Sequence, residues 1–243
     1  WIARLGSGLD IIDLDAARER AVEVLSAPEG NAQAVAEHAM GMLLGLANKL
    51  ISADRNVREG GWMREAHRGW EIAGKTIGII GHGHNGSAFG RLWKGWNVKV
   101  LAYDKYLSNY APQGVEETTL EKLKAEADIL SLHIPLTEET REMINAEFIE
   151  ACKPGFILIN TSRGKNVNLS DVCRALQSGQ IGGACLDVFP TEPPGHSQGE
   201  TLRAFETICG MDNVVLSPHV AGWTVESRRK IAEVLLEKIG ALR

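Results

Sequence analysis

The stretch TIGIIGHGHNG, residues 76–86, decides the fold of this 243-residue chain. Its first five residues suit a buried strand, and Gly81, Gly83 and Gly86 follow with the GxGxxG spacing of a turn that opens a helix. Glycines at these positions permit a tight turn and let the backbone approach a pyrophosphate, which the free N–H groups of the helix bind. The stretch therefore predicts the phosphate-binding unit of a dinucleotide-binding sheet.

A carboxylate stands where such a unit needs its second contact. Asp104 lies about 20 residues beyond the turn, at the end of the next apolar run. A carboxylate there accepts a hydrogen bond from a ribose 2′-hydroxyl, which favours NAD over NADP. Lys105 comes next and leaves acceptance of a 2′-phosphate open. The alternative interpretation is a glycine-rich turn beside a surface aspartate.

The other residues of the turn are polar. His84 and Asn85 are expected to contact the cofactor through their backbone, because only backbone contacts are required there. His82 and His84 suggest a metal at first sight, but no further ligand lies close to them in the sequence. We therefore expect no metal site.

Outward from this stretch, five further apolar runs of strand length follow, with helical patterns between them. Most of these six runs are apolar almost throughout, which is typical of strands covered on both faces. The alternation predicts an α/β fold with a doubly wound parallel sheet. The six predicted strands are Thr76–Ile80, Val98–Tyr103, Asp128–His133, Gly155–Asn160, Gly182–Asp187 and Asn213–Ser217.

Four helices are predicted from their capping residues. The capping box Thr118–Glu121 opens a helix toward Ala127, and Ser170 or Asp171 caps the next one. Two helices flank the alternation, one after Asn31 over Ala32–Leu50 and one from Thr224 to a stop at Gly240.

Three residues with chemistry in common follow three successive strands. Arg163, Glu192 and His219 each stand just beyond a predicted strand, where ligands of doubly wound sheets bind. Arginine offers a fork of donors to a carboxylate or a carbonyl, histidine carries protons near neutral pH, and a carboxylate beside the histidine orients its ring. Singly, each has a plain structural alternative, a helix-capping arginine, a surface glutamate or a core histidine. Together, beside a dinucleotide loop, they indicate a catalytic site.

With these motifs in order, the chain resembles the D-2-hydroxyacid dehydrogenase family, within it the D-3-phosphoglycerate dehydrogenase and glyoxylate/hydroxypyruvate reductase group. The resemblance covers almost the whole chain and rests on several motifs. They are Gly6–Asp10, Asn31–His38, Gly81–Gly86, Asn160–Gly164, Asp187–Pro193 and Pro218–Gly222.

The resemblance implies a role for each site residue. Arg163 would bind the substrate carboxylate and carbonyl oxygen, His219 would be the acid/base paired with Glu192, and the backbone amides of Ser7 and Gly8 would help to hold the substrate carboxylate. The residues implied to lie along the NAD groove are His133, Pro135, Thr137, Thr161, Asp187 and Gly222. The implied substrate is a small 2-hydroxy or 2-oxo acid, of the phosphoglycerate type or the glyoxylate/hydroxypyruvate type.

The resemblance also implies two domains, of which one is incomplete. Residues 1–30 resemble the end of a flavodoxin-like substrate domain, residues 31–222 the NAD-binding domain, and residues 223–243 a helix returning to the substrate domain. About 70 residues of that domain are expected before Trp1, in keeping with ordinary domain sizes.

Composition restricts the partners. A net charge of −5 argues against nucleic acid, and no apolar run reaches the length of a membrane span. Four cysteines without CxxC pairing fit a cytoplasmic protein. The apolar helix Ala32–Leu50 and an arm with Trp62 and Trp70 predict a homodimer, although both could cover the chain's own core. An NAD-sensing, corepressor-like binding protein and an inactive fragment of the same fold remain alternatives to an enzyme.

Overall fold

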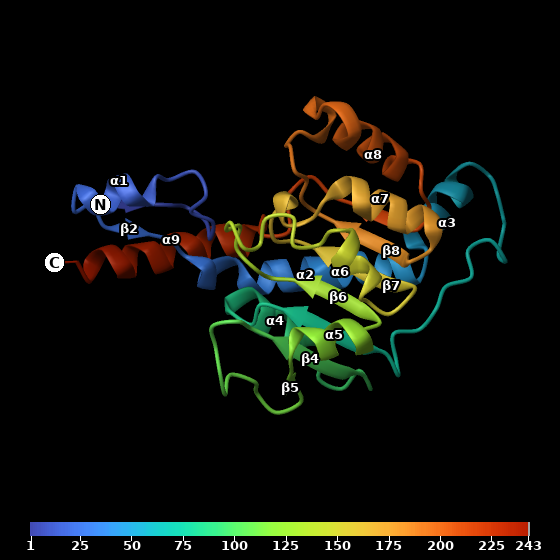
Figure 1. Cartoon of the computed structure of the whole chain (residues 1–243), viewed down its shortest axis with the longest axis horizontal. Helices are drawn as coiled ribbons and strands as arrows, with labels where there is room; N and C mark the ends of the chain where they lie inside the picture. Colours follow the sequence, from blue (N-terminus) through green and yellow to red (C-terminus); the bar gives the residue numbers. More distant parts are fainter. Residues whose placement is uncertain (243) are drawn as a thin grey trace.

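Residues 1–242 are described by a computed structural model, and a seven-stranded parallel sheet lies at their centre (Figure 1). Its order is β5-β4-β3-β6-β7-β8-β9, so the chain winds outward from β3 in one direction and from β6 in the other. The strands are β3 (Thr76–Ile80), β4 (Lys99–Tyr103), β5 (Glu116–Glu117), β6 (Ile129–Leu132), β7 (Phe156–Asn160), β8 (Ile181–Leu186) and β9 (Val214–Leu216). The predicted doubly wound sheet is confirmed, and the six predicted strands agree with it to within two residues. The short edge strand β5 was not expected.

Helices cover both faces of the sheet because successive strand residues point to opposite sides. Ile79 packs under α2 (Pro28–Ala47) and α4 (His84–Leu92), whereas Ile80 belongs to the core on the other face. The helices over that other face are α5 (Leu120–Glu126), α6 (Ala146–Glu150), α7 (Leu169–Ser178) and α8 (Gly199–Cys209). Single 3-10 turns lie at Gly164–Asn166 and Pro194–His196. Both faces are therefore buried, as the apolar strand sequences required.

The two ends of the chain meet beside the sheet, at the left of Figure 1. The N-terminal segment contains β1 (Ile2–Ala3), α1 (Leu14–Glu19) and β2 (Val24–Leu25), with β1 and β2 paired in parallel. The last helix, α9 (Val225–Gly240), packs Ile231 and Leu235 against Leu25. This arrangement is compatible with the predicted division at residues 30 and 222, which stays a prediction.

The predicted start of the long helix is wrong. Helix α2 begins at Pro28, and Asn31 lies within its first turn instead of capping it. Proline is favoured at the first helical position because its fixed φ suits a helix and its missing N–H would have no partner there. The helix also ends at Ala47, since Lys49 adopts a left-handed φ of 50° before α3 (Leu50–Arg58) begins.

Two other predicted caps are displaced along the chain. Helix α5 is capped by Thr119, which accepts from the N–H of Lys122, so the expected box at Thr118 does not form. Helix α7 is capped by Asn168 and not by Ser170 or Asp171. The cap of α5 lies one residue after the predicted position, and the cap of α7 lies two residues before Ser170. The predicted cap of α9 is confirmed, because Thr224 and Ser227 form a reciprocal capping box.

After α3 the chain forms an arm that runs along the outside of the molecule before it enters β3 (Figure 1). Trp62 on this arm has 78% of its side-chain surface exposed, whereas Trp70 packs against the core under α2. Within residues 1–242, no helix combines the length and apolarity needed to cross a bilayer.

Candidate active site

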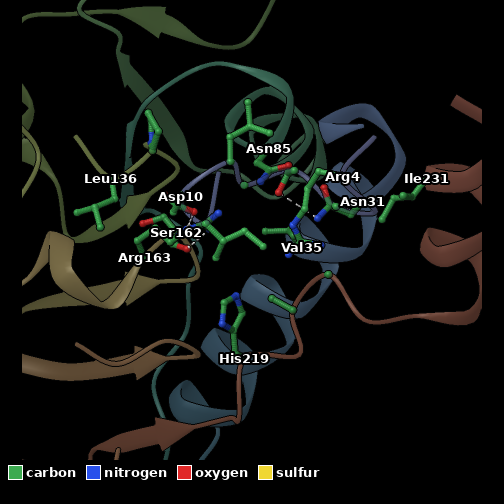
Figure 2. A pocket seen from close by; sticks show the side chains of 18 of the residues that line it. Arg4, Asp10, Asn31, Val35, Asn85, Leu136, Ser162, Arg163, His219 and Ile231 are labelled. Atoms are coloured by element: carbon green, nitrogen blue, oxygen red, sulfur yellow. Dashed lines mark hydrogen bonds and ion pairs between the residues drawn. The ribbon is translucent and has the colours of Figure 1, made fainter. Parts of the chain in front are cut away.

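A cavity of about 1470 Å³ lies at the carboxyl ends of the sheet strands, closed on its other sides by the N-terminal segment, α2 and the start of α9 (Figure 2). Most predicted site residues line it. They are Ser7, Gly8, Asn85, His133, Pro135, Thr137, Thr161, Arg163, Asp187, His219 and Gly222. The other predicted residues lie outside this lining. They are Gly81, Gly83, His84, Gly86, Asp104 and Glu192.

The three glycines of the β3–α4 turn differ in backbone conformation and in the space around them. Gly81 has a left-handed φ of 87°, and a Cβ on Gly86 would stand only 1.9 Å from the Gly81 carbonyl oxygen. A Cβ on Gly83 would meet nothing within 4 Å, and no side chain caps the helix that starts there. Open space thus lies over uncapped N–H groups at a helix N-terminus, which fits a pyrophosphate.

The carboxylate of Asp104 ties the end of β4 to this turn. It accepts from the N–H of His82 at 2.8 Å and from the N–H groups of Tyr106 and Leu107 at 2.9 and 3.1 Å. Lys105, the residue that could accept a 2′-phosphate, forms an ion pair with Glu139, with 2.6 Å between Nζ and Oε1. The lysine is therefore already partnered by a carboxylate at the position where a 2′-phosphate would need it.

Two histidines beneath the turn are held neutral by burial. Burial lowers the pKa of His133 to about 3, and its Nε2 lies 2.9 Å from the Ser131 hydroxyl. Burial also lowers the pKa of His82, although the nearby Asp104 opposes the shift. His133 therefore adds no positive charge near neutral pH, and the N–H groups of the turn would attract a phosphate. Within residues 1–242, no three His, Cys, Asp or Glu side chains come together as metal ligands.

Arg163 reaches the cavity from the end of β7 and is fixed on both sides. Its Nε donates to Asp10 Oδ2 at 2.7 Å and its Nη1 to the Ser162 carbonyl at 2.8 Å. A Cβ on Gly8 would overlap Arg163 Nη2 at 1.6 Å, so only glycine admits the guanidinium there. The Nη2 donors have no acceptor among residues 1–242 and are left for a ligand in the cavity.

His219 also lines the cavity, in the loop after β9, and lies below Arg163 in the view of Figure 2. Its Nδ1 lies 2.7 Å from Glu192 Oε2, and Glu192 Oε1 accepts from the N–H of Phe189 at 3.1 Å. Because a carboxylate only accepts, Nδ1 carries a proton and Nε2 is left for the cavity. The structure thus brings the three predicted catalytic residues together, with Glu192 behind the imidazole.

Asp187 has partners that the sequence did not reveal. Its side chain is fully buried, and its carboxylate accepts from the N–H groups of Val220 and Ala221, both at 2.9 Å, and from the Ser217 hydroxyl. The carboxylate therefore fixes the loop that carries His219.

Four cavity-lining side chains carry a buried polar atom without a protein partner. These atoms are Arg4 Nε, Asn31 Oδ1, Asn85 Oδ1 and Thr161 Oγ1. Unpaired buried polar atoms are rare in folded proteins, and their concentration here is consistent with a ligand that completes them.

Sequence reasoning missed several residues of the cavity. Asp10 lies within the motif Gly6–Asp10, but no sequence pattern predicted its ion pair with Arg163. Asn31 was expected to be a cap, although it donates to Ser7 Oγ at 3.4 Å. Arg4 and Arg228 also line the cavity, and neither has a carboxylate within 4 Å among residues 1–242. No sequence signal separated these two arginines from ordinary surface cations.

Comparison with known proteins gives a consistent result. The model of a family described as "D-isomer specific 2-hydroxyacid dehydrogenase, NAD binding domain" matches residues 40–221. The chain is 39% identical over 238 residues to a hydroxypyruvate reductase of Thermotoga maritima, covering 98% of this chain and 76% of the relative. It is 39% identical over 240 residues to a D-3-phosphoglycerate dehydrogenase of a Synechocystis species, but spans only 42% of that relative's length.

Solved structures agree with the sequence matches. A D-lactate dehydrogenase from Aquifex aeolicus, crystallised with NAD and lactic acid, superposes with a TM-score of 0.89 at 33% identity, over 99% of this chain and 74% of that one. An imino acid reductase crystallised with NADPH and D-Arg superposes with a TM-score of 0.87 at 28% identity, with coverages of 99% and 74%. The same fold therefore accompanies either dinucleotide.

Proposed function

Because the chain belongs to the D-isomer specific 2-hydroxyacid dehydrogenase family, we propose that it interconverts a D-2-hydroxy acid and its 2-oxo acid with NAD. The predicted family, an NAD-dependent oxidoreductase family, is confirmed by these matches. One observation carries the proposal for this chain. Arg163 and His219 line one cavity, each is held by a carboxylate, and Arg163 Nη2 and His219 Nε2 have no hydrogen-bond partner among residues 1–242.

The cofactor would lie along the carboxyl edge of the sheet. Gly81, Gly83 and Gly86 would present the N–H groups of α4 to the pyrophosphate, and Asp104 would accept from the adenosine ribose. The nicotinamide part of the groove would be lined by His133, Pro135, Thr137, Thr161, Asp187 and Gly222. When bound, NADH supplies the hydride for the carbonyl carbon.

His219 would move the proton of the reaction through Nε2. In the reducing direction, negative charge develops on the carbonyl oxygen, and the imidazole donates a proton to it. Glu192 holds Nδ1, so the ring keeps its orientation while Nε2 gains and loses the proton. Glu192 would also stabilise the positive charge on the ring before the transfer.

Arg163 would orient the acid. Its free Nη2 donors suit a carboxylate or a developing oxyanion, and this kind of electrostatic stabilisation is usually the largest contribution in such sites. Ser7 and Gly8 also line the cavity, and their N–H groups would bind the substrate carboxylate. Asp10 would keep the guanidinium in the plane that serves both.

The charge of the cavity favours a substrate with a second anionic group. Arg4 and Arg228 stand in the lining without a carboxylate partner, and Arg4 Nε has no partner at all. A phosphorylated 2-oxo acid would satisfy them, whereas glyoxylate would not. We therefore place 3-phosphohydroxypyruvate ahead of hydroxypyruvate and glyoxylate, the substrates implied by the names of the relatives.

The proposal is tested by following the oxidation of NADH with each of these three acids, using the protein at its natural length. We expect turnover with at least one acid, and the highest kcat/KM with the phosphorylated one. NADH binding without turnover of any acid would overturn the enzyme and favour an NAD-sensing binding protein. Turnover that ignores the phosphate would overturn the substrate order alone.

We also propose a homodimer in the cytoplasm. Trp62 and Met63 are 78% and 59% exposed on the arm after α3, and a second copy of the chain would cover these neighbouring apolar side chains. Light scattering at several concentrations would report the mass directly, and a monomer at all of them would overturn the assembly.

A further inference from the structure

A line of polar side chains runs from α2 to Asp187, and two of them, His38 and Ser217, have no part in the chemistry described above. His38 on α2 places Nε2 2.9 Å from the Ser217 hydroxyl and 3.6 Å from Asp187 Oδ1. The Ser217 hydroxyl in turn lies 2.5 Å from Asp187 Oδ1. The His38 side chain is about a quarter exposed and that of Asp187 is fully buried, so the line leads from the helix surface into the core.

The chemistry of the three groups fixes the direction of their hydrogen bonds. A carboxylate only accepts, so the Ser217 hydroxyl donates to Asp187. The thioether of Met42, 3.6 Å away, is a much weaker acceptor for the same proton. With its proton committed, Ser217 accepts from His38, and Nε2 of His38 must therefore carry a hydrogen. The structure thus selects one tautomer of His38.

Asp187 transmits this line to the acid/base loop. Its carboxylate accepts from the N–H groups of Val220 and Ala221, and its backbone carbonyl accepts from the N–H of His219 at 2.7 Å. His219 itself has a left-handed φ of 55°, a conformation that residues with a side chain rarely adopt. The bonds to Asp187 hold that conformation, and with it the direction of the imidazole.

We propose that His38 is a positioning residue, which acts through Ser217 and Asp187 to keep the His219 loop in its working conformation. Its Nε2–H donates into a buried carboxylate network that has no other side-chain donor besides Ser217 among residues 1–242. Loss of that donor leaves the Ser217 oxygen and the Asp187 charge less well satisfied, and the loop less firmly held. For its effect on turnover, the inference rests on the proposed function.

Helix α2 makes two contacts with the site, one through Asn31 and one through His38. Asn31, Val35 and His38 follow one another at helical spacing on the face toward the site. Asn31 contacts Ser7 on the substrate side of the cavity, and His38 contacts Ser217 on the acid/base side. One rigid helix therefore sets the distance between the two walls.

Three substitutions of His38 separate the hydrogen bond from packing. His38→Gln places an amide N–H near the position of Nε2, whereas His38→Asn is too short and reaches only the position of Nδ1. His38→Leu keeps apolar volume and removes every donor. We expect Gln to behave like the wild type, and Asn and Leu to behave alike.

The first measurement is independent of catalysis. Amide hydrogen exchange of His219, Val220 and Ala221 should be about fivefold faster in His38→Leu and His38→Asn than in the wild type, and restored in His38→Gln. Nitrogen-15 chemical shifts of the wild-type ring should report a hydrogen on Nε2. A hydrogen on Nδ1 alone, or equal exchange in all four proteins, would overturn the inference.

The second measurement is the turnover of the best 2-oxo acid. We expect kcat about fivefold lower in His38→Leu and His38→Asn, with little change in the KM for NADH, and recovery in His38→Gln. Equal damage in Gln and Leu would show a packing role and overturn the inference. If the wild type has no turnover, the proposed function fails while the exchange experiment still decides the role of His38.

Discussion

The β3–α4 turn forms a wall of backbone beside the cavity, whereas the wall at the ends of β7, β8 and β9 is made of side chains. The turn needs only glycines, a helix start and Asp104, all within a short piece of sequence. The other wall holds Arg163 through Asp10, 153 positions away, and Ser217 through His38, 179 positions away. Local sequence is therefore sufficient for the first wall, and the second depends on how distant segments pack.

This difference separates the consequences of mutation. A change at the side-chain wall should stop the chemistry and leave the fold and the dinucleotide site intact. A change at the backbone wall should act on folding or on dinucleotide binding, according to whether the new atom meets protein or open space. The predictions below test that separation.

Replacement of the acid/base should have the largest effect. His219→Ala should lower kcat by about 10²–10⁴-fold, because the positioned proton donor is lost. The NADH dissociation constant, measured by fluorescence titration, should change by less than about threefold, since His219 is not part of the phosphate turn. Glu192→Gln keeps a partner for Nδ1 and should lose less. Wild-type turnover in His219→Ala would remove His219 from its role.

Two glycine-to-alanine substitutions in the β3–α4 turn should have different effects, one on stability and the other on NADH binding. Gly86→Ala should lower the free energy of unfolding by about 1–3 kcal/mol, because its Cβ would stand 1.9 Å from the Gly81 oxygen. Gly83→Ala should stay within about 0.5 kcal/mol, since its Cβ meets no protein atom, yet it should weaken NADH binding. Urea unfolding and fluorescence titration measure the two effects. Equal stability of the two variants would contradict this account.

Acid should destabilise the free protein through His133. Its pKa is about 3 in the folded chain against about 6.5 when unfolded, so the unfolded chain binds the extra proton between those values. Stability contributed by the neutral ring is complete above pH 6.5 (about the unfolded pKa) and is lost as pH falls, by up to about 1 kcal/mol per pH unit. His133→Gln should have a shallower dependence between roughly pH 6.5 and 4.5 in urea unfolding. Parallel curves for the two proteins would exclude His133 as the cause.

The smallest expected effect concerns the choice between dinucleotides. Glu139→Gln should raise the affinity for NADPH by about threefold and leave that for NADH unchanged, because Lys105 is released from its exposed ion pair. The double variant with Lys105→Ala should lose the gain. If both cofactors gain equally, Lys105 has no part in the discrimination.

The sequence predicted the sheet well and the helix starts poorly. Strands buried on both faces leave long apolar runs that few other structures produce, so their positions agreed to within two residues. Helix starts depend on competition between neighbouring caps, and at Asn31, Thr118 and Asp171 the packing of the helix selected a different residue. Pro28 is the residue in the sequence that indicates the start of α2, because proline is favoured at the first helical position.

Apart from the pairing of His219 with Glu192, the candidate site was predicted by residue type and not by contact. Arg163, Glu192 and His219 could be found because the carboxyl ends of parallel strands always meet at one edge. Asp10, Arg4 and His38 could not be found, because each acts only through a neighbour that folding brings to it. Asp187 was found, but its bonds to the backbone of the His219 loop were not.

By itself the sequence determined a doubly wound NAD-binding sheet and the three residues at its edge, since periodic burial and a glycine turn are local properties of the chain. Only the tertiary structure decided how those residues are held: Arg163 by Asp10, and the His219 loop by Asp187, Ser217 and His38. The physical reason is that hydrogen bonds over such separations depend on distances between packed elements, and no pattern along the chain records those distances.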